Sequence, residues 1–292
     1  MRFFDRFSHS NARSARRLGT GLAALAGLAV MAAAAFPAVY GAMAQTAAQP
    51  QTAGAPQVPD WALPASATHK QVPPPKDFHR RTRTYDQKIG IFEAQSDIGG
   101  ALVPGSASFD PATGTYTINS AGYNIWYTRD EFRFLWKKMS GDVSFAANVG
   151  FPVAENPPRD RKVVMVIRQD LDDDSKEIMA AEHGSGMVHL AERPEKDEMM
   201  NDMEYRIAGR SGPDSKLTVA MPRRIGIEKR GDSVSLWVSV EGEPMHQFGP
   251  PVEIHFKGPF YVGIGFCSHY PVTLDSGTFS DVVLKNEAGE LR

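Results

Sequence analysis

The stretch from Phe132 to Trp136 constrains the fold more than any other part of this 292-residue sequence. Successive side chains of an extended strand point to opposite faces, so Phe132, Phe134 and Trp136 share one face. A row of three aromatic rings needs a cover, and in a β-protein a second sheet supplies it. We therefore expect a two-layer β-sandwich in which these rings face the second sheet.

The chain after residue 88 repeats one pattern, a short run of β-branched and aromatic residues followed by turn residues. Helical periodicity is nearly absent after the N-terminal apolar segment. The pattern predicts an all-β fold, an antiparallel two-sheet β-sandwich of jelly-roll type. The expected strands after the aromatic row are 143–149, 162–169, 177–183, 187–193, 203–208, 217–221, 224–229, 233–240, 252–256, 260–268 and 278–284.

The N-terminus has the three parts of a secretory signal peptide. Five arginines lie within residues 1–17, an almost wholly apolar run follows from Leu18 to Phe36, and Ala42-Met43-Ala44 forms a small-x-small cleavage site. We predict a signal peptide over residues 1–44 and a periplasmic or secreted mature protein. The apolar run approaches the length of a membrane span, so an uncleaved anchor is the alternative. The choice between general secretion and twin-arginine export stays open.

The rest of the chain divides by composition. Residues 45–88 are rich in Ala, Gln, Thr and Pro and predict an extended linker. The predicted sandwich spans residues 89–286, and residues 287–292 form a short tail. The formal net charge is only −2, without a basic stripe, which argues against a nucleic-acid partner. Cys267 is the single cysteine, so a disulfide framework and a cysteine-based zinc site are excluded, and we expect a buried thiol.

Several short motifs in the predicted sandwich resemble a known family. They are Asp97-Ile98-Gly99, Gly105-Ser106, Phe109-Asp110, Asn124-Ile125-Trp126, Asp130-Glu131-Phe132-Arg133-Phe134, Met139-Ser140-Gly141-Asp142, Met165-Val166-Ile167-Arg168-Gln169, His183-Gly184, Ile227-Glu228-Lys229-Arg230-Gly231-Asp232 and Tyr261-Val262-Gly263-Ile264-Gly265. Over residues 91–284 the chain resembles the concanavalin A-like lectin/glucanase superfamily, especially exported modules found alone or beside bacterial TolB-like propellers. The resemblance implies a concanavalin A-like sandwich but no particular reaction, because lectins, glycosidases and inert scaffolds share this fold.

The hairpin predicted around Gly184-Ser185-Gly186 carries the most suggestive polar side chains. A three-residue turn places Ala181 opposite His189, so both His183 and His189 lie on one face. With Arg168 and Tyr205 they form a candidate ligand-binding surface for sugar hydroxyls. The alternative is an ordinary polar face of a sandwich.

Aromatic residues near the start of the domain suggest a second contact. Tyr123 and Tyr127 have the strand parity opposite to that of the expected buried positions, so we expect both rings to be exposed. A sugar ring could stack on such a pair. Trp126 is expected in the core. Packing at the core or at an edge is the alternative.

Catalytic and metal sites are weakly supported. A glycosidase needs two convergent carboxylates; Glu182 and Glu204 would converge only in a particular register, and residues 195–198 form a charged loop. Asp170, Asp172 and Asp174 imitate the start of a calcium loop but lack its later glycine and glutamate. We predict no catalytic residues, no metal ligands and no obligatory cofactor, with calcium as the one candidate ion.

The sequence therefore predicts an exported, non-catalytic module that binds a glycan or a partner in the cell envelope. A glycan-degrading hydrolase of the same superfamily and a structural accessory domain of an envelope complex are the alternatives. The ligand and the oligomeric state are left undetermined.

Overall fold

The computed structural model describes residues 79–152, 160–206 and 221–291, all within one compact unit. The predicted signal peptide, most of the predicted linker and the predicted strand 217–221, apart from Met221, lie outside the described residues. The described part of the chain contains no helical segment that could span a bilayer. The predicted all-β fold is confirmed: the described elements are antiparallel strands in two large sheets, the layout of a β-sandwich.

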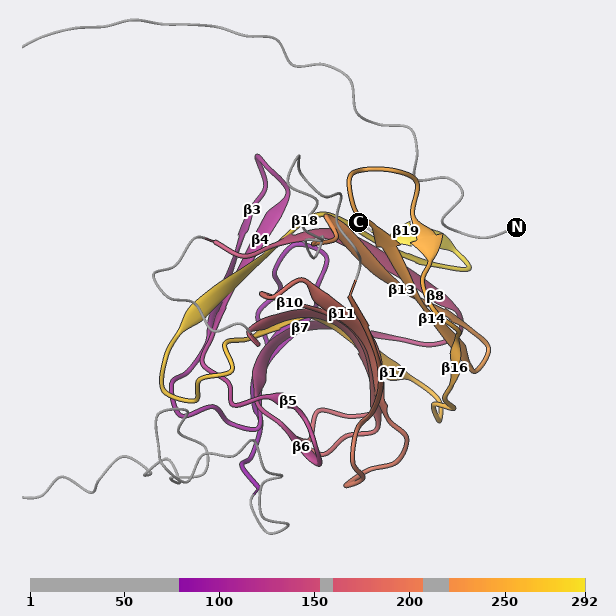
Figure 1. The fold of residues 1–292 in the computed structure, drawn as a ribbon. Helices are drawn as coiled ribbons and strands as arrows, with labels where there is room; N and C mark the ends of the chain where they lie inside the picture. The colour runs from indigo at the N-terminus through magenta and orange to yellow at the C-terminus, as the bar shows by residue number, and fades with distance from the viewer. Residues whose placement is uncertain (1–78, 153–159, 207–220, 292) are drawn as a thin grey trace, which may run out of the picture. The chain divides into compact units, whose positions relative to one another are not determined.

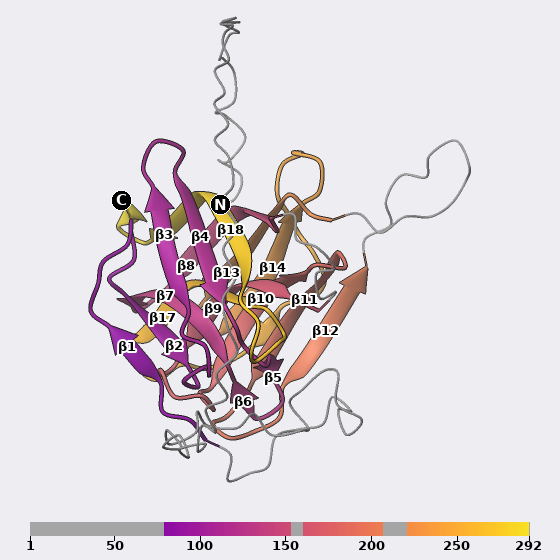
Figure 2. The same ribbon diagram turned by 90° about the vertical axis from the view of Figure 1, so that its left-hand side faces the viewer.

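The first sheet contains eight strands in the order β1-β2-β7-β17-β9-β10-β11-β12. Figure 1 shows this sheet as a strongly curved arc. Its strands are β1 (Arg83–Tyr85), β2 (Ala94–Ile98), β7 (Phe132–Met139), β17 (Phe260–Cys267), β9 (Lys162–Arg168), β10 (Glu177–His183), β11 (Met187–Arg193) and β12 (Asn201–Arg206). Figure 2 shows β1 and β12 at opposite edges.

The second sheet contains nine strands and lies across the convex side of the first (Figure 1). Seven of them follow the order β15-β14-β13-β8-β18-β4-β3, while β16 pairs with β14 and β19 with β18. These strands are β3 (Ser106–Asp110), β4 (Thr115–Ser120), β8 (Val143–Gly150), β13 (Arg224–Arg230), β14 (Ser233–Ser239), β15 (His246–Gln247), β16 (Val252–Glu253), β18 (Asp275–Asn286) and β19 (Gly289–Leu291).

The main core fills the space between the two sheets. Leu135 of β7, Val163 of β9 and Ile264 of β17 meet Phe145 of β8 and Ile227 of β13 there. These residues alternate along their strands with residues that face the other way, which is the period-two pattern of a sheet covered on both sides. Burial of this apolar surface is the main favourable contribution to the stability of the fold.

A second apolar core lies on the concave side of the first sheet, and it corrects one sequence-based expectation. Phe132 and Phe134 belong to this core, with Trp136 packed against it, instead of to the core between the sheets. The short hairpin β5–β6 (Ile125–Trp126 and Arg129–Asp130) covers them (Figure 1). The aromatic row does need a cover, but a hairpin and its flanking loops supply it because the sheet curls around them.

The sandwich begins earlier than its predicted boundary at residue 89. Arg83–Tyr85, within the predicted linker, pair with Gln95–Asp97 as strand β1. The hydroxyl of Thr84 lies 3.0 Å from that of Ser96, and Arg83 donates to the carbonyl oxygen of Ala101 at 2.5 Å. All three β1 residues are exposed, so their sequence lacks the alternating apolar pattern that reveals a strand.

Candidate functional site

The predicted hairpin has the predicted register. Ala181 lies opposite His189 in the β10–β11 pair, and both histidine rings project from the concave face. The Nε2 atoms of His183 and His189 are 3.3 Å apart. The indole of Trp126 stacks on His189 with ring centroids 5.4 Å apart, so the β5–β6 hairpin reaches this end of the concave face.

The two histidines are interior residues. His183 is 5% exposed and His189 1%, and the neighbouring Lys162 is 2% exposed. Burial, with a smaller contribution from the charge of Lys162, holds the pKa of His189 well below its ordinary value. The amine of Lys162 donates to Asn124 Oδ1 at 2.8 Å and to the carbonyl of Ile125 at 3.3 Å. These side chains therefore hold the β5–β6 hairpin against the first sheet and do not form an open surface.

Arg168 occupies the opposite end of the concave face, in a fully buried ion cluster. Its Nη1 donates to Asp130 Oδ2 at 2.9 Å and contacts Glu177, and Arg193 Nη2 donates to Asp130 Oδ1 at 2.7 Å. Burial alone would raise the pKa of Asp130, but Arg193 and Arg168 hold it below its ordinary value. Arg168 is therefore joined to the covering hairpin through Asp130 of β6, and its side chain does not reach solvent.

The structure does not bring the three predicted tyrosines together with the histidines as one exposed surface. Tyr123 is only 6% exposed and stacks on His269, which corrects the expectation of an exposed ring; burial raises its pKa to about 12. Tyr127 is half-buried. Tyr205 lies opposite Val188, so it projects from the face opposite His189 and packs against the main core beside Phe248.

The predicted carboxylates do not converge. Glu182 lies opposite Val163 and Val188 and shares their core-facing side, whereas Glu204 lies opposite His189 and shares its concave side. The charged loop is ion-paired: Glu195 contacts Lys176 at 2.9 Å and Asp197 contacts Arg129 at 2.6 Å.

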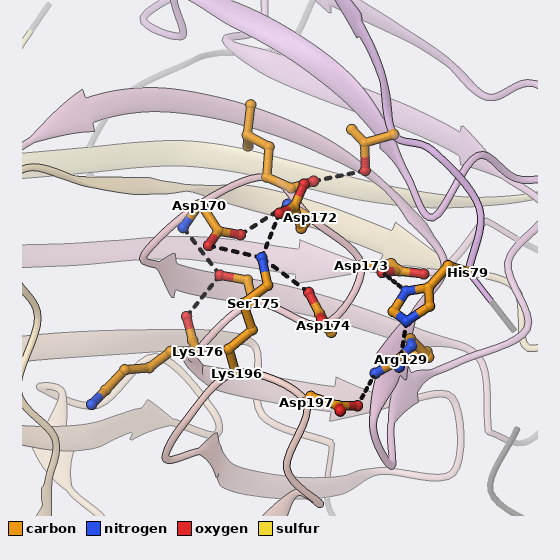
Figure 3. Close-up of polar contacts among 12 residues, drawn as sticks. His79, Arg129, Asp170, Asp172, Asp173, Asp174, Ser175, Lys176, Lys196 and Asp197 are labelled. Atoms are coloured by element: carbon orange, nitrogen blue, oxygen red, sulfur yellow. Dashed lines mark hydrogen bonds and ion pairs between the residues drawn. The ribbon is translucent and has the colours of Figure 1, made fainter. Parts of the chain in front are cut away.

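The aspartate run of the β9–β10 turn surrounds an ammonium group. Lys196 Nζ lies 3.4 Å from Asp170 Oδ2 and 3.3 Å from Asp174 Oδ1, and it also contacts Asp172 (Figure 3). These three carboxylates raise the pKa of Lys196 against the opposing effect of partial burial. The lysine side chain therefore supplies the positive charge at the position where a calcium ion would sit.

Beside this turn lies a pocket of about 510 Å³ between the segment before β1 and the aspartate run. A binding pocket for a small ligand has a volume of this order. All but one of its lining residues carry hydrogen-bonding side chains. They are His79, Arg80, Arg81, Thr82, Thr84, Leu171, Asp172, Asp173, Asp174 and Lys196.

The pocket wall is held together by contacts between segments about 90 residues apart. His79 Nδ1 lies 3.0 Å from Asp173 Oδ1, and the Thr82 hydroxyl donates to the carbonyl of Leu171 at 2.6 Å. Arg129 Nη2 lies 2.6 Å from His79 Nε2 (Figure 3). Because a guanidinium only donates, Nε2 accepts and Nδ1 carries the ring proton that Asp173 accepts.

The donors and acceptors at the pocket carry both signs of charge. Asp173 is 6% exposed, and burial raises the pKa of its carboxyl despite the contact with His79. His79, Asp173 and Asp174 offer ligand atoms within 4.8 Å of one another, a spacing that suits a metal ion. A metal bound there would compete with Arg129 for His79 and with Lys196 for Asp174. The arrangement therefore suits a polar organic ligand better than a bare cation.

The pocket could not be predicted from the sequence, because residues 79–84 fall within the predicted linker. One local signal exists, the run Asp170–Asp174, which imitates the start of a calcium loop. No local sequence pattern indicates that His79 contacts Asp173.

Comparisons with known proteins identify no family. No protein-family model matches the sequence, and no curated protein matches it by sequence. Among solved structures, the chain is similar to a functionally unknown protein from Saccharomyces cerevisiae, with 16% identity and a TM-score of 0.47 over 63% of this chain and 93% of that chain. It is similar to the carbohydrate binding module CBM66 from Bacillus subtilis, with 11% identity and a TM-score of 0.40 over 63% of this chain and 92% of that chain.

A third similar structure is the alginate lyase from Klebsiella pneumoniae, with 12% identity and a TM-score of 0.41 over 62% of this chain and 84% of that chain. TM-scores this low support no inference about function. The sandwich assignment rests on the strand pairing of the protein itself.

Proposed function

We propose that this protein is an exported, non-catalytic β-sandwich module that binds a glycan or another hydroxyl-rich component of the cell envelope. One observation carries the proposal, the pocket of about 510 Å³ whose lining offers both hydrogen-bond donors and acceptors. Sugar hydroxyls both donate and accept, so they are matched by a wall that offers carboxylates, guanidinium groups and hydroxyls together. Export rests on the signal-peptide pattern of residues 1–44.

Three exposed residues offer the pocket's clearest ligand contacts. Arg81 and Thr84 are both exposed and line the pocket from the N-terminal side. Asp172 lines it from the other side and is exposed as well. A sugar ring between them would exchange water for hydrogen bonds of the charge-assisted kind, which are stronger than neutral ones.

The test is a glycan-array screen of the full-length protein, with and without calcium. We expect binding that falls at least about fivefold in Arg81→Ala and Thr84→Val, since each removes a hydrogen bond worth roughly 1 kcal/mol or more. Arg223→Ala is the matched control, because Arg223 is an exposed arginine outside the pocket. Calcium dependence would show that an ion can replace the Lys196 ammonium among the three aspartates.

Three outcomes would move the assignment elsewhere. Glycan binding that is lost in His189→Phe but kept in Arg81→Ala and Thr84→Val would place the binding site at the β10–β11 hairpin. Release of reducing sugar from a bound glycan would support the alternative, a glycan-degrading hydrolase. No binding to any glycan would overturn the proposal and favour a structural role in an envelope complex.

A further inference from the structure

We infer that the pocket takes a zwitterionic glycan, one whose sugars carry both an ammonium group and a carboxylate. The inference rests on the proposed function and sharpens it, since it names the chemical class of the ligand. It starts from the division of charge between the two walls of the pocket. Residues 79–82 and Thr84 form the N-terminal wall, and residues 171–174 with Lys196 form the opposite wall.

The N-terminal wall presents positive charge. Arg80 and Arg81 line the pocket from this side, while His79 is held as the neutral tautomer between Arg129 and Asp173. The Arg81 side chain is exposed and makes no ion pair or hydrogen bond within the described part of the chain. Its guanidinium donors are therefore available to a ligand, and a guanidinium recognises a carboxylate through two parallel hydrogen bonds.

Arg80 adds to the positive charge of this wall because its charge is only partly offset. Arg80 Nη1 lies 3.1 Å from Glu131 Oε1. Burial raises the pKa of Glu131 to about 7, so at neutral pH a substantial share of these carboxyl groups is protonated and uncharged. A guanidinium, in contrast, stays charged at every physiological pH. A second positive charge therefore persists beside Arg81.

The opposite wall has an excess of negative charge. Asp172, Asp173 and Asp174 line it, together with one ammonium group, that of Lys196. This ammonium group is shared further, because it also contacts Asp170, which lies outside the pocket lining (Figure 3). One lysine cannot neutralise three carboxylates, so the lining of this wall keeps a net negative charge.

Asp172 is the carboxylate best placed to meet a ligand. Its side chain is 67% exposed, whereas Asp173 and Asp174 are buried. Within the described part of the chain, the carboxylate of Asp172 has Lys196 as its partner and is otherwise open to solvent. An ammonium group of a ligand can therefore approach Asp172 without displacing Lys196.

The two walls together favour a ligand that carries both charges. A neutral glycan would leave the Arg81 guanidinium without a counter-ion. A purely anionic glycan would bring carboxylates close to the acidic turn, and a purely cationic glycan would bring ammonium groups close to Arg80 and Arg81. Like charges brought together lower the affinity, so the walls select against both of these ligands and in favour of the zwitterion.

The experiment compares four ligands that share one backbone, by isothermal titration calorimetry with the full-length protein at pH 7. They are cellohexaose, its aminoethyl ether, its carboxymethyl ether and the mixed ether that carries both groups. We expect the mixed ether to bind at least about tenfold more tightly than cellohexaose, because charge-assisted hydrogen bonds are stronger than neutral ones. The two singly charged ethers should bind more weakly than the mixed ether.

Two variants assign the charged groups of the ligand to the two walls. Arg81→Ala should remove the preference for carboxymethyl groups and keep the preference for aminoethyl groups, and Asp172→Asn should do the reverse. Both variants should remain folded, because the Arg81 side chain makes no polar contact in the described structure and Lys196 keeps its contacts with Asp170 and Asp174. Unfolding curves verify this.

Matched controls and distinct outcomes separate this inference from the proposed function. Arg223→Ala and Asp232→Asn change exposed residues outside the pocket and should bind all four ligands like the unaltered protein. Equal affinity for cellohexaose and the mixed ether, with binding that still falls in Arg81→Ala, would overturn the zwitterion and keep the glycan proposal. No binding of any of the four would overturn both. Tetraglycine, a zwitterion without a sugar ring, should not bind; if it binds as tightly as the mixed ether, the ligand is not a glycan.

Discussion

At the scale of the residue, the neighbouring carboxyl groups of Asp130 and Glu131 have pKa values shifted in opposite directions by their surroundings. Asp130 lies between two guanidinium groups and is held ionised at 1% exposure. Glu131 is 7% exposed and has one close cation, Arg80, at 3.1 Å. Burial therefore dominates at Glu131 and raises its pKa to about 7, although Arg80 and two backbone N–H groups oppose the shift.

The raised pKa of Glu131 predicts a loss of stability as pH rises. The group takes up a proton near pH 7 in the folded state and near pH 4.5 when unfolded, so the folded state binds more protons between these values. The contribution of Glu131 to the free energy of unfolding is fully present below pH 4.5 and is lost as the pH rises through 7. The total loss is about 3 kcal/mol at most. Glu131→Gln should remove this part of the pH dependence.

The measurement is the free energy of unfolding in urea from pH 4.5 to 8, for the unaltered protein and for Glu131→Gln. The difference between them cancels the other titrating groups. A constant difference across this range would mean that Glu131 has an ordinary pKa in the fold.

At the scale of the element, glycines of one strand make room for the aromatic rings of the next. Gly263 and Gly265 of β17 lie beside β7, where a Cβ on Gly263 would stand 1.8 Å from the carbonyl oxygen of Leu135. A Cβ on Gly265 would stand 2.7 Å from the ring of Phe132. The rings of Phe132 and Phe134 can therefore lie close to the backbone of β17 on the concave face.

Gly265→Ala should destabilise the protein by roughly 1–3 kcal/mol, the usual cost of overpacking a core. Phe132→Leu removes the atoms that the new methyl group would meet, so the double variant should lose less stability than the sum of the single variants. Urea unfolding of the four proteins measures this coupling. Strict additivity would show that the ring of Phe132 is not what excludes a side chain at position 265.

At the scale of the whole molecule, the segment before β2 belongs to the sandwich and builds one wall of the pocket. His79 and Arg80 contact Asp173, and Thr82 bonds to Leu171. β1 then covers the edge of β2. The predicted boundary at residue 89 therefore separates the sheet from its own edge strand.

Deletion of residues 79–88 should cost roughly 2–4 kcal/mol, since it removes several hydrogen bonds of about 0.5–1.5 kcal/mol each and exposes an unpaired edge. It should also abolish binding at the pocket, because the deletion removes the pocket's N-terminal wall. Thermal unfolding and the glycan-binding assay measure these effects. Unchanged stability and unchanged glycan binding would contradict the role assigned to this segment.

Features that depend on local periodicity could be predicted from the amino-acid sequence. It predicted the β-sandwich, most strand positions and the register of the hairpin that places His183 and His189 on one face, because strand alternation and turn length are local properties. What covers each face of a strand depends on the three-dimensional arrangement of the sheets and loops. The curl of the first sheet gave the Phe132–Trp136 row its cover and buried the histidines, while contacts across about 90 residues joined His79 to Asp173. Such contacts depend on how distant segments meet, and no local pattern records that.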